Sequence, residues 1–188
     1  TLTVTAGSTK AINYSILSAG SAISANALSV SGTITMNNTY GCATAPCTAL
    51  TAIDNYITTS NFSTLATTST GITISGALTG GTGVLLDGVT YSGNQGVYST
   101  VAVTATTGNI DVLGITNGGA SANGIYASGT GATFTATTGN VVLNGIQLAG
   151  NAAVNLNGVV TATAGSVTIT GSNTSGNFAF WDNALITA

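Results

Sequence analysis

Four aspartates and one lysine are all the charged side chains in this 188-residue sequence, which contains no arginine and no histidine. Asp87 and Asp111 lie 24 residues apart (111 − 87), nearly one period of an internal repeat. Paired carboxylates on a parallel β-helix would favour polysaccharide hydrolysis or calcium-dependent lyase chemistry. Such enzymes normally add further acids and a cation, and here only Lys10 is available. We therefore expect no catalytic residues and no cofactor, and we keep a polysaccharide-active enzyme only as the weakest alternative.

The missing histidines and cations exclude several other classes. Ser-His-Asp and Cys-His nucleophiles need an imidazole base, and histidine-based zinc sites need imidazole ligands. Nucleic-acid binding needs several cations to displace the counterions of phosphate groups, and one lysine cannot do this. We expect neither a metal site nor a nucleic-acid partner.

The two cysteines enclose a short segment that contains the only proline of the sequence. Four residues, 43–46, separate Cys42 from Cys47. A local disulfide suits an exported protein, whereas a metal or redox site would need a third ligand or a neighbouring base. We predict a disulfide, and we interpret residues 37–65 as an irregular insertion between more regular segments.

The elements that position these residues are predicted to be strands. Hydrophobic residues make up 44% of the chain, while glycine, threonine and β-branched residues replace the usual helix formers. Short alternating runs broken by glycine and asparagine indicate strands and tight turns. No uninterrupted apolar stretch is long enough to span a membrane as a helix, so we expect no transmembrane segment.

The sequence repeats itself. The segment TATTGNI at residues 104–110 returns as TATTGNV at residues 135–141, and a looser copy, TATAGSV, occupies residues 161–167. A period of 26–31 residues indicates one supersecondary unit stacked on the next. Aligning the copies also aligns three columns of apolar residues, which we predict to be the core stack: Val103, Phe134 and Val160; Ile110, Val141 and Val167; Val112, Leu143 and Ile169.

This pattern predicts an all-β fold, a right-handed parallel β-helix, also called a β-solenoid, that forms one domain or a segment of a longer one. Residues 1–36 would form degenerate coils and residues 66–188 regular ones. Gly108, Gly139 and Gly165 would mark a corner where left-handed backbone angles suit glycine. The neighbouring Asn109 and Asn140 would form a short ladder along the stack.

Alternate residues of the same strands are predicted to form a threonine ladder on the outside. Its members are Thr104, Thr106, Thr135, Thr137, Thr161 and Thr163. Threonine fits exposed parallel strands and stacks hydroxyl on hydroxyl, which explains the ladder without any ligand. A flat T-x-T array is also similar to the surface of ice-binding β-solenoids, so ice binding stays open as an alternative function.

The segments TATTGNIDVLG, NGIYASG, TATTGNVVLNGIQLAG and NGVVTATAGSVTITG resemble the repeats of filamentous-haemagglutinin-type bacterial adhesins. These are large exoproteins of the two-partner secretion class or related autotransported adhesins. The resemblance covers residues 66–188 well and residues 1–36 weakly. It implies a secreted right-handed parallel β-helix that serves in long surface fibres for adhesion or aggregation.

We therefore expect an extracellular, cell-surface-associated scaffold without catalytic activity that stacks or extends into filaments. Its expected partners are other copies of itself, or flanking repeats of a longer chain, and glycans on host or environmental surfaces. The near-absence of charge suits that role, because such surfaces associate without like-charge repulsion.

Overall fold

The computed structural model describes the backbone of five short N-terminal strands, together with residues 70–90 and 94–188. The N-terminal strands cover residues 2–4, 12–15, 23–25, 28–30 and 33–37. The predicted insertion at residues 37–65, beyond Asn37, and the predicted disulfide between Cys42 and Cys47 lie outside the described residues.

The described residues form three parallel sheets and contain no helix. Sheet A has seven strands: β1 (Leu2–Val4), β3 (Ile23–Ala25), β6 (Ile72–Ile74), β9 (Gln95–Ser99), β12 (Asn123–Ala127), β15 (Ala152–Leu156) and β18 (Phe178–Asp182). Sheet C has six: β4 (Leu28–Val30), β7 (Leu78–Gly80), β10 (Val103–Ala105), β13 (Phe134–Ala136), β16 (Val159–Ala162) and β19 (Leu185–Thr187). Sheet B also has six: β2 (Ile12–Ser15), β5 (Thr33–Asn37), β8 (Gly83–Thr90), β11 (Ile110–Thr116), β14 (Val141–Gln147) and β17 (Val167–Asn173).

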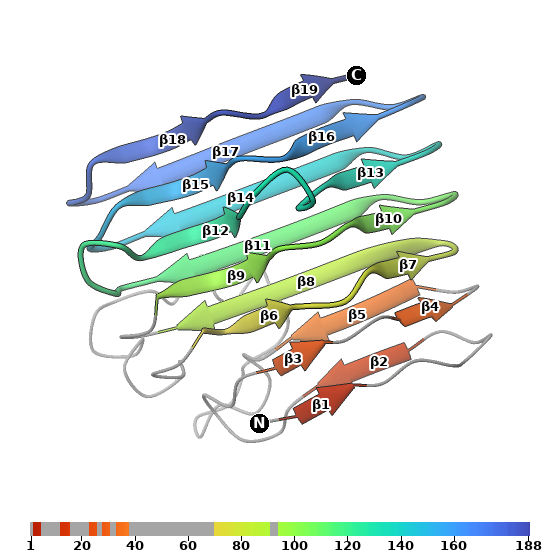
Figure 1. Ribbon diagram of the computed structural model, residues 1–188, viewed down its shortest axis with the longest axis horizontal. Helices are drawn as coiled ribbons and strands as arrows, with labels where there is room; N and C mark the ends of the chain where they lie inside the picture. The colour runs from red at the N-terminus through yellow and green to blue at the C-terminus, as the bar shows by residue number, and fades with distance from the viewer. Residues whose placement is uncertain are drawn as a thin grey trace, which may run out of the picture.

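From β3 to β17 each coil contributes one strand to each sheet in the order A, C, B, and the next coil pairs on top of it (Figure 1). The first described coil contributes β1 and β2 to sheets A and B, and the last contributes β18 and β19 to sheets A and C. In that view the chain runs from left to right through sheets A and C and returns behind them through sheet B, rising toward the C-terminus. This path makes a right-handed coil. The predicted right-handed parallel β-solenoid is therefore confirmed.

The core columns predicted from the repeat are the observed strand register. Val103 pairs with Phe134, and Phe134 pairs with Val160. The columns that begin at Ile110 and Val112 continue in the same way in sheet B. Seven of these nine side chains belong to one buried hydrophobic cluster, and the other two, Val167 and Ile169 on the last strand of sheet B, are partly exposed and pack against it.

The corner glycines have a different cause from the predicted one. Gly108, Gly139 and Gly165 do lie at the corner between sheets C and B, but positive φ angles occur instead at Gly83, Gly129 and Gly150. A Cβ at Gly139 would overlap the carbonyl of Gly108, and one at Gly165 would overlap that of Gly139. Close stacking of successive coils, and not left-handed backbone geometry, therefore requires glycine at this corner.

A second column of glycines lies where sheets A and B approach each other closely. Its members pair along sheet B and are Gly88, Gly114, Gly145 and Gly171. A Cβ at each would run into the backbone of sheet A, for example into the carbonyl of Ala153 opposite Gly145. Two residues further along the strands of sheet B, the next inward column is polar and fully buried at Thr90, Thr116 and Gln147. The coil is thus divided into a large apolar part and a small polar one.

Candidate binding surfaces

The outward face of sheet C carries a longer threonine ladder than the sequence pattern predicts. The predicted residues Thr104, Thr135 and Thr161 pair in register. The same column continues to Thr79 on one side and Thr187 on the other, so five threonines stand in line. Their spacing is that of a parallel sheet, about 4.8 Å per coil.

The second predicted rank lies at the edge of the same face. Thr106, Thr137 and Thr163 are exposed, and each donates its backbone N–H to a carbonyl of the preceding coil at 2.9–3.0 Å. The sheet ladder therefore extends one residue beyond the strands. The two ranks form a surface of hydroxyl and methyl groups without charge.

Asparagine side chains tie the coils together at the corners. At the corner between sheets C and B, the Asn109 Oδ1 accepts from the backbone N–H of Asn140 at 2.9 Å. The Asn140 Oδ1 in turn accepts from the N–H of Ser166 at 2.9 Å and from its hydroxyl at 3.0 Å. The predicted ladder exists, but it joins each side chain to the backbone of the next coil and not amide to amide.

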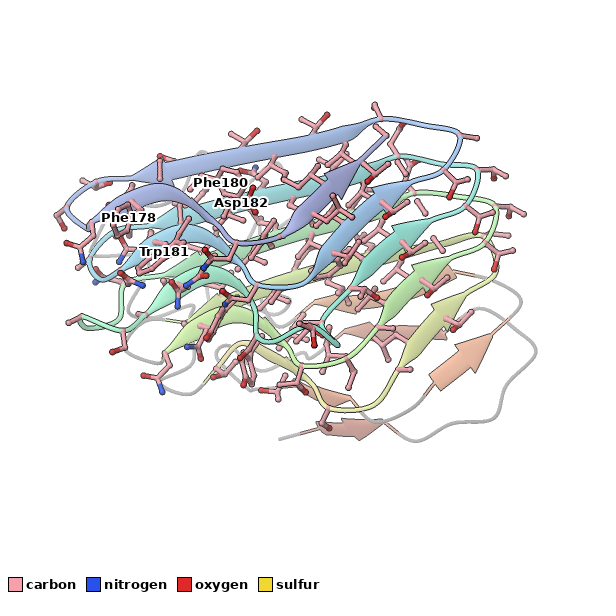
Figure 2. All side chains as sticks on the ribbon, turned by 45° about the horizontal axis from the view of Figure 1, so that its top comes forward. Phe178, Phe180, Trp181 and Asp182 are labelled. Carbon is pink, nitrogen blue, oxygen red and sulfur yellow. The ribbon has the colours of Figure 1, made fainter. Side chains whose placement is uncertain are left out.

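The outward face of sheet A carries aromatic residues in one column. The register places Tyr98 below Tyr126, then Asn155, then Trp181. The rings of Tyr98 and Tyr126 lie 5.5 Å apart between centroids, tilted by 41°. Trp181 contacts Phe178 edge-on with centroids 4.8 Å apart, as Figure 2 shows at the last strand of the sheet. Asn155 is 8% exposed between the tyrosine below and the tryptophan above.

More asparagines surround this column. Asn177 donates to Asn151 and Asn151 donates to Asn123, both over 3.4 Å, while Asn183 donates to Asn157 over 3.0 Å. Because these pairs connect successive coils, the amides flank the aromatic column on both sides. From the sequence alone, the aromatic residues fit a sugar-stacking surface and caps over the solenoid equally well: Tyr98, Tyr126, Phe178, Phe180 and Trp181. The register places Tyr98, Tyr126 and Trp181 in one outward column and Phe180 in a core column.

The last described coil exposes large apolar side chains of two kinds. Phe180 and Ile186, which are 40% and 36% exposed, continue the core columns of Val154 and Val160. Trp181 is also 40% exposed but continues the outward column of Tyr126. Figure 2 shows Phe180 toward the interior of the coil and Trp181 on its outer side.

The two aspartates weighed as a catalytic pair share the outward face of sheet B, but the register does not place them opposite one another. Asp87 pairs with Leu113, and Asp111 pairs with Leu85 and Val142. Asp87 is fully buried. Asp111 is partly exposed, and its desolvation raises the pKa of the carboxyl above its ordinary value.

Within the described residues no group of three or more histidine, cysteine or acidic side chains could hold a metal ion. That part of the chain also contains no helix long and apolar enough to cross a membrane. The described interior of the coil holds the apolar cluster and the closely packed glycine column, and the candidate sites described above lie on the outward faces.

The comparisons add no relative to this picture. No family model, no curated protein and no solved structure matches the chain.

Proposed function

We propose that this chain is a section of an extracellular structural or adhesive fibre, a non-catalytic β-solenoid that presents its faces for attachment. The observation that carries the proposal is the unbroken register of the coils. In sheets A, B and C each described strand pairs in parallel with the strand of the next coil, so the fold extends by addition of coils along one axis. A shape of this kind suits a spacer or fibre.

The surface composition supports the same role. The chain has a single cation, and the described outward faces of sheets A and C carry mainly threonine, asparagine and aromatic side chains. Such faces associate without like-charge repulsion. In the proposed fibre a further coil, from a longer chain or from another copy, covers Phe180 and Ile186 and pairs with the edges of β17, β18 and β19. The resemblance of residues 66–188 to haemagglutinin-type repeats points in the same direction.

Attachment can be tested with coated latex beads. Beads that carry the folded chain should aggregate or attach to cell surfaces, and the soluble chain should compete. Beads coated with the Phe134→Asp variant, which places a carboxylate in the core and unfolds the coil, serve as control. Negative-stain electron microscopy of the same preparation should show rods or filaments. Dispersed beads together with isolated globular particles would contradict the proposal.

A second candidate function, ice binding, is favoured by one observation. The outward threonine column has five members in register, with three further threonines alongside it. A flat array of hydroxyl and methyl groups at regular spacing can order water into a lattice.

This alternative predicts thermal hysteresis that Thr135→Tyr abolishes, because a bulky ring interrupts the array. Thr170→Tyr is the matched control, since Thr170 is exposed on the outward face of sheet B. Absence of hysteresis in the wild-type chain removes this candidate.

A further inference from the structure

We propose that the outward face of sheet A around Trp181 binds neutral, extended glycans. This inference rests on the proposed adhesive function and names its target class. It starts from the aromatic column, in which the rings of Tyr98, Tyr126 and Trp181 project on one side of the sheet. Exposed aromatic rings offer an apolar surface that matches the C–H faces of sugar rings.

The exposure of Trp181 and its neighbour supports this role. Trp181 is 40% and Phe178 is 43% exposed, and the two rings hold each other edge-on. The contact fixes the orientation of both rings, so little side-chain freedom remains to be lost when a ligand binds. Unlike Phe180, Trp181 does not belong to a core column, so the continuation of the apolar core does not explain its outward position.

The amides beside the rings provide the polar half of the recognition. Asn177 and Asn183 are exposed, and each is held by a hydrogen bond to an asparagine of the coil below. An amide offers two donors and an acceptor with two lone pairs, so each can still bond a ligand. Hydroxyl groups of a sugar both donate and accept, which is the chemistry that amides match.

The charge of this face selects uncharged sugars. Residues 70–188 contain no lysine, arginine or histidine, so a uronate, sialate or sulfate group would find no counter-charge there. Asp182 adjoins Trp181 in the sequence, but it pairs with Leu156 and so continues a core column, where its Oδ1 accepts from the N–H of Ala184 at 2.7 Å. An acidic glycan therefore gains no counter-charge on the outward face, whereas a neutral one needs none.

The coil spacing favours an extended chain over a single sugar. Successive coils are about 4.8 Å apart. This is close to the length that each pyranose adds to an extended β-linked chain, so a glycan that runs along the stack meets the same column once per sugar. The Tyr98–Tyr126 pair lies in that path and is half-buried.

The test uses the only tryptophan of the chain, Trp181, as its own probe. The intact chain is titrated with cellohexaose, xylohexaose and mannohexaose, and tryptophan fluorescence is followed, with trigalacturonate as the anionic comparison. We expect a saturable blue shift or quenching with at least one neutral hexasaccharide and none with trigalacturonate. No saturable change with any of the three neutral probes, or an equal response to trigalacturonate, would overturn the inference.

Matched variants separate this face from the apolar end of the coil. In pull-downs on cellulose, xylan and mannan, Trp181→Ala should weaken binding about tenfold or more. Phe180→Ala should leave it unchanged, although Phe180 has the same exposed fraction. Circular dichroism checks that both variants fold. Equal losses in the two variants, or full binding by Trp181→Ala, would refute the assignment. Bead attachment that persists without glycan binding would leave the adhesive proposal standing and remove only this inference.

Discussion

Sheets A and B approach each other closely at Gly145, and we therefore predict that the variant Gly145→Ala is less stable than the wild type. A Cβ at this position would lie 2.5 Å from the Cγ2 of Val154 and 2.6 Å from the carbonyl carbon of Ala153, and nearer still to the Ala153 carbonyl oxygen. Because two of these atoms belong to the backbone, no side-chain rotation relieves the overlap. The two sheets must separate, which also disturbs the coils above and below.

The expected loss follows from two opposing terms. Overpacking costs about 1–3 kcal/mol, and the upper end applies where backbone must move. Alanine also restricts the unfolded chain, which returns about 0.4–1 kcal/mol. The net destabilisation is about 2 kcal/mol, which corresponds to a melting temperature about 4–8 °C lower for a chain of this size.

Gly119→Ala is the matched control, because a Cβ at Gly119 meets no atom within 4 Å. This variant should be as stable as the wild type or slightly more stable. Urea unfolding and thermal melts followed by circular dichroism compare the three proteins. If Gly145→Ala is as stable as Gly119→Ala, the sheets do not approach each other as described and the argument fails.

Three further substitutions test other parts of the structure. Phe134→Ala should lower the free energy of unfolding in urea by about 3–5 kcal/mol, because Phe134 is fully buried in the central core column. Thr135→Ala, on the outward side of the same strand, should lower it by less than about 1 kcal/mol. Equal losses would contradict the assigned faces. Asn140→Ala removes the acceptor of two hydrogen bonds from Ser166 and should lower the free energy of unfolding by about 1 kcal/mol. Asn144→Ala, on the outward face of β14, should leave it unchanged. A lower melting temperature for Asn144→Ala than for Asn140→Ala would contradict the corner ladder. Burial raises the pKa of Asp111 in the folded state, so the folded chain binds the proton more tightly than the unfolded chain and stability falls as pH rises from the ordinary pKa through the folded one. Asp111→Asn should weaken the pH dependence of stability and stabilise the chain at pH 7. If the pH profile of the melting temperature is the same in this variant as in the wild type, the burial of the Asp111 carboxyl does not control that dependence.

The sequence predicts the stacking of the coils because the repeats preserve inward-facing residue types. Val103, Phe134 and Val160 fall in one column of the alignment and in one column of the sheet. The corner after each copy is also predicted, since glycine and asparagine recur there. Column-wise repetition is a strong signal in this fold, because each coil has only the neighbouring coils to pack against.

Other features leave no such signal. The segment around Thr79 reads LTG instead of VTA, so its place in the threonine ladder is visible only from the strand pairing. Glycine inside a strand, as at Gly114, is compatible with a bulge or a turn, and only the opposing carbonyl of Gly124 shows that it makes room for a second sheet. Asn177 and Asn183 follow Asn151 and Asn157 by 26 residues, within the range of the repeat, but only the register places these pairs beside Trp181.

Distances between spin labels along the threonine ladder test the stacking of coils most directly. Labels at Thr79 and Thr161 are three coils apart, and labels at Thr79 and Thr187 are four coils apart. With Cys42 and Cys47 replaced by serine, dipolar electron paramagnetic resonance should give backbone separations of about 14 Å and about 19 Å, allowing for the label arms. The account requires that the second distance exceed the first by one coil spacing. Equal distances, or a shorter distance for the pair with Thr187, would show that the coils do not lie in register on one another.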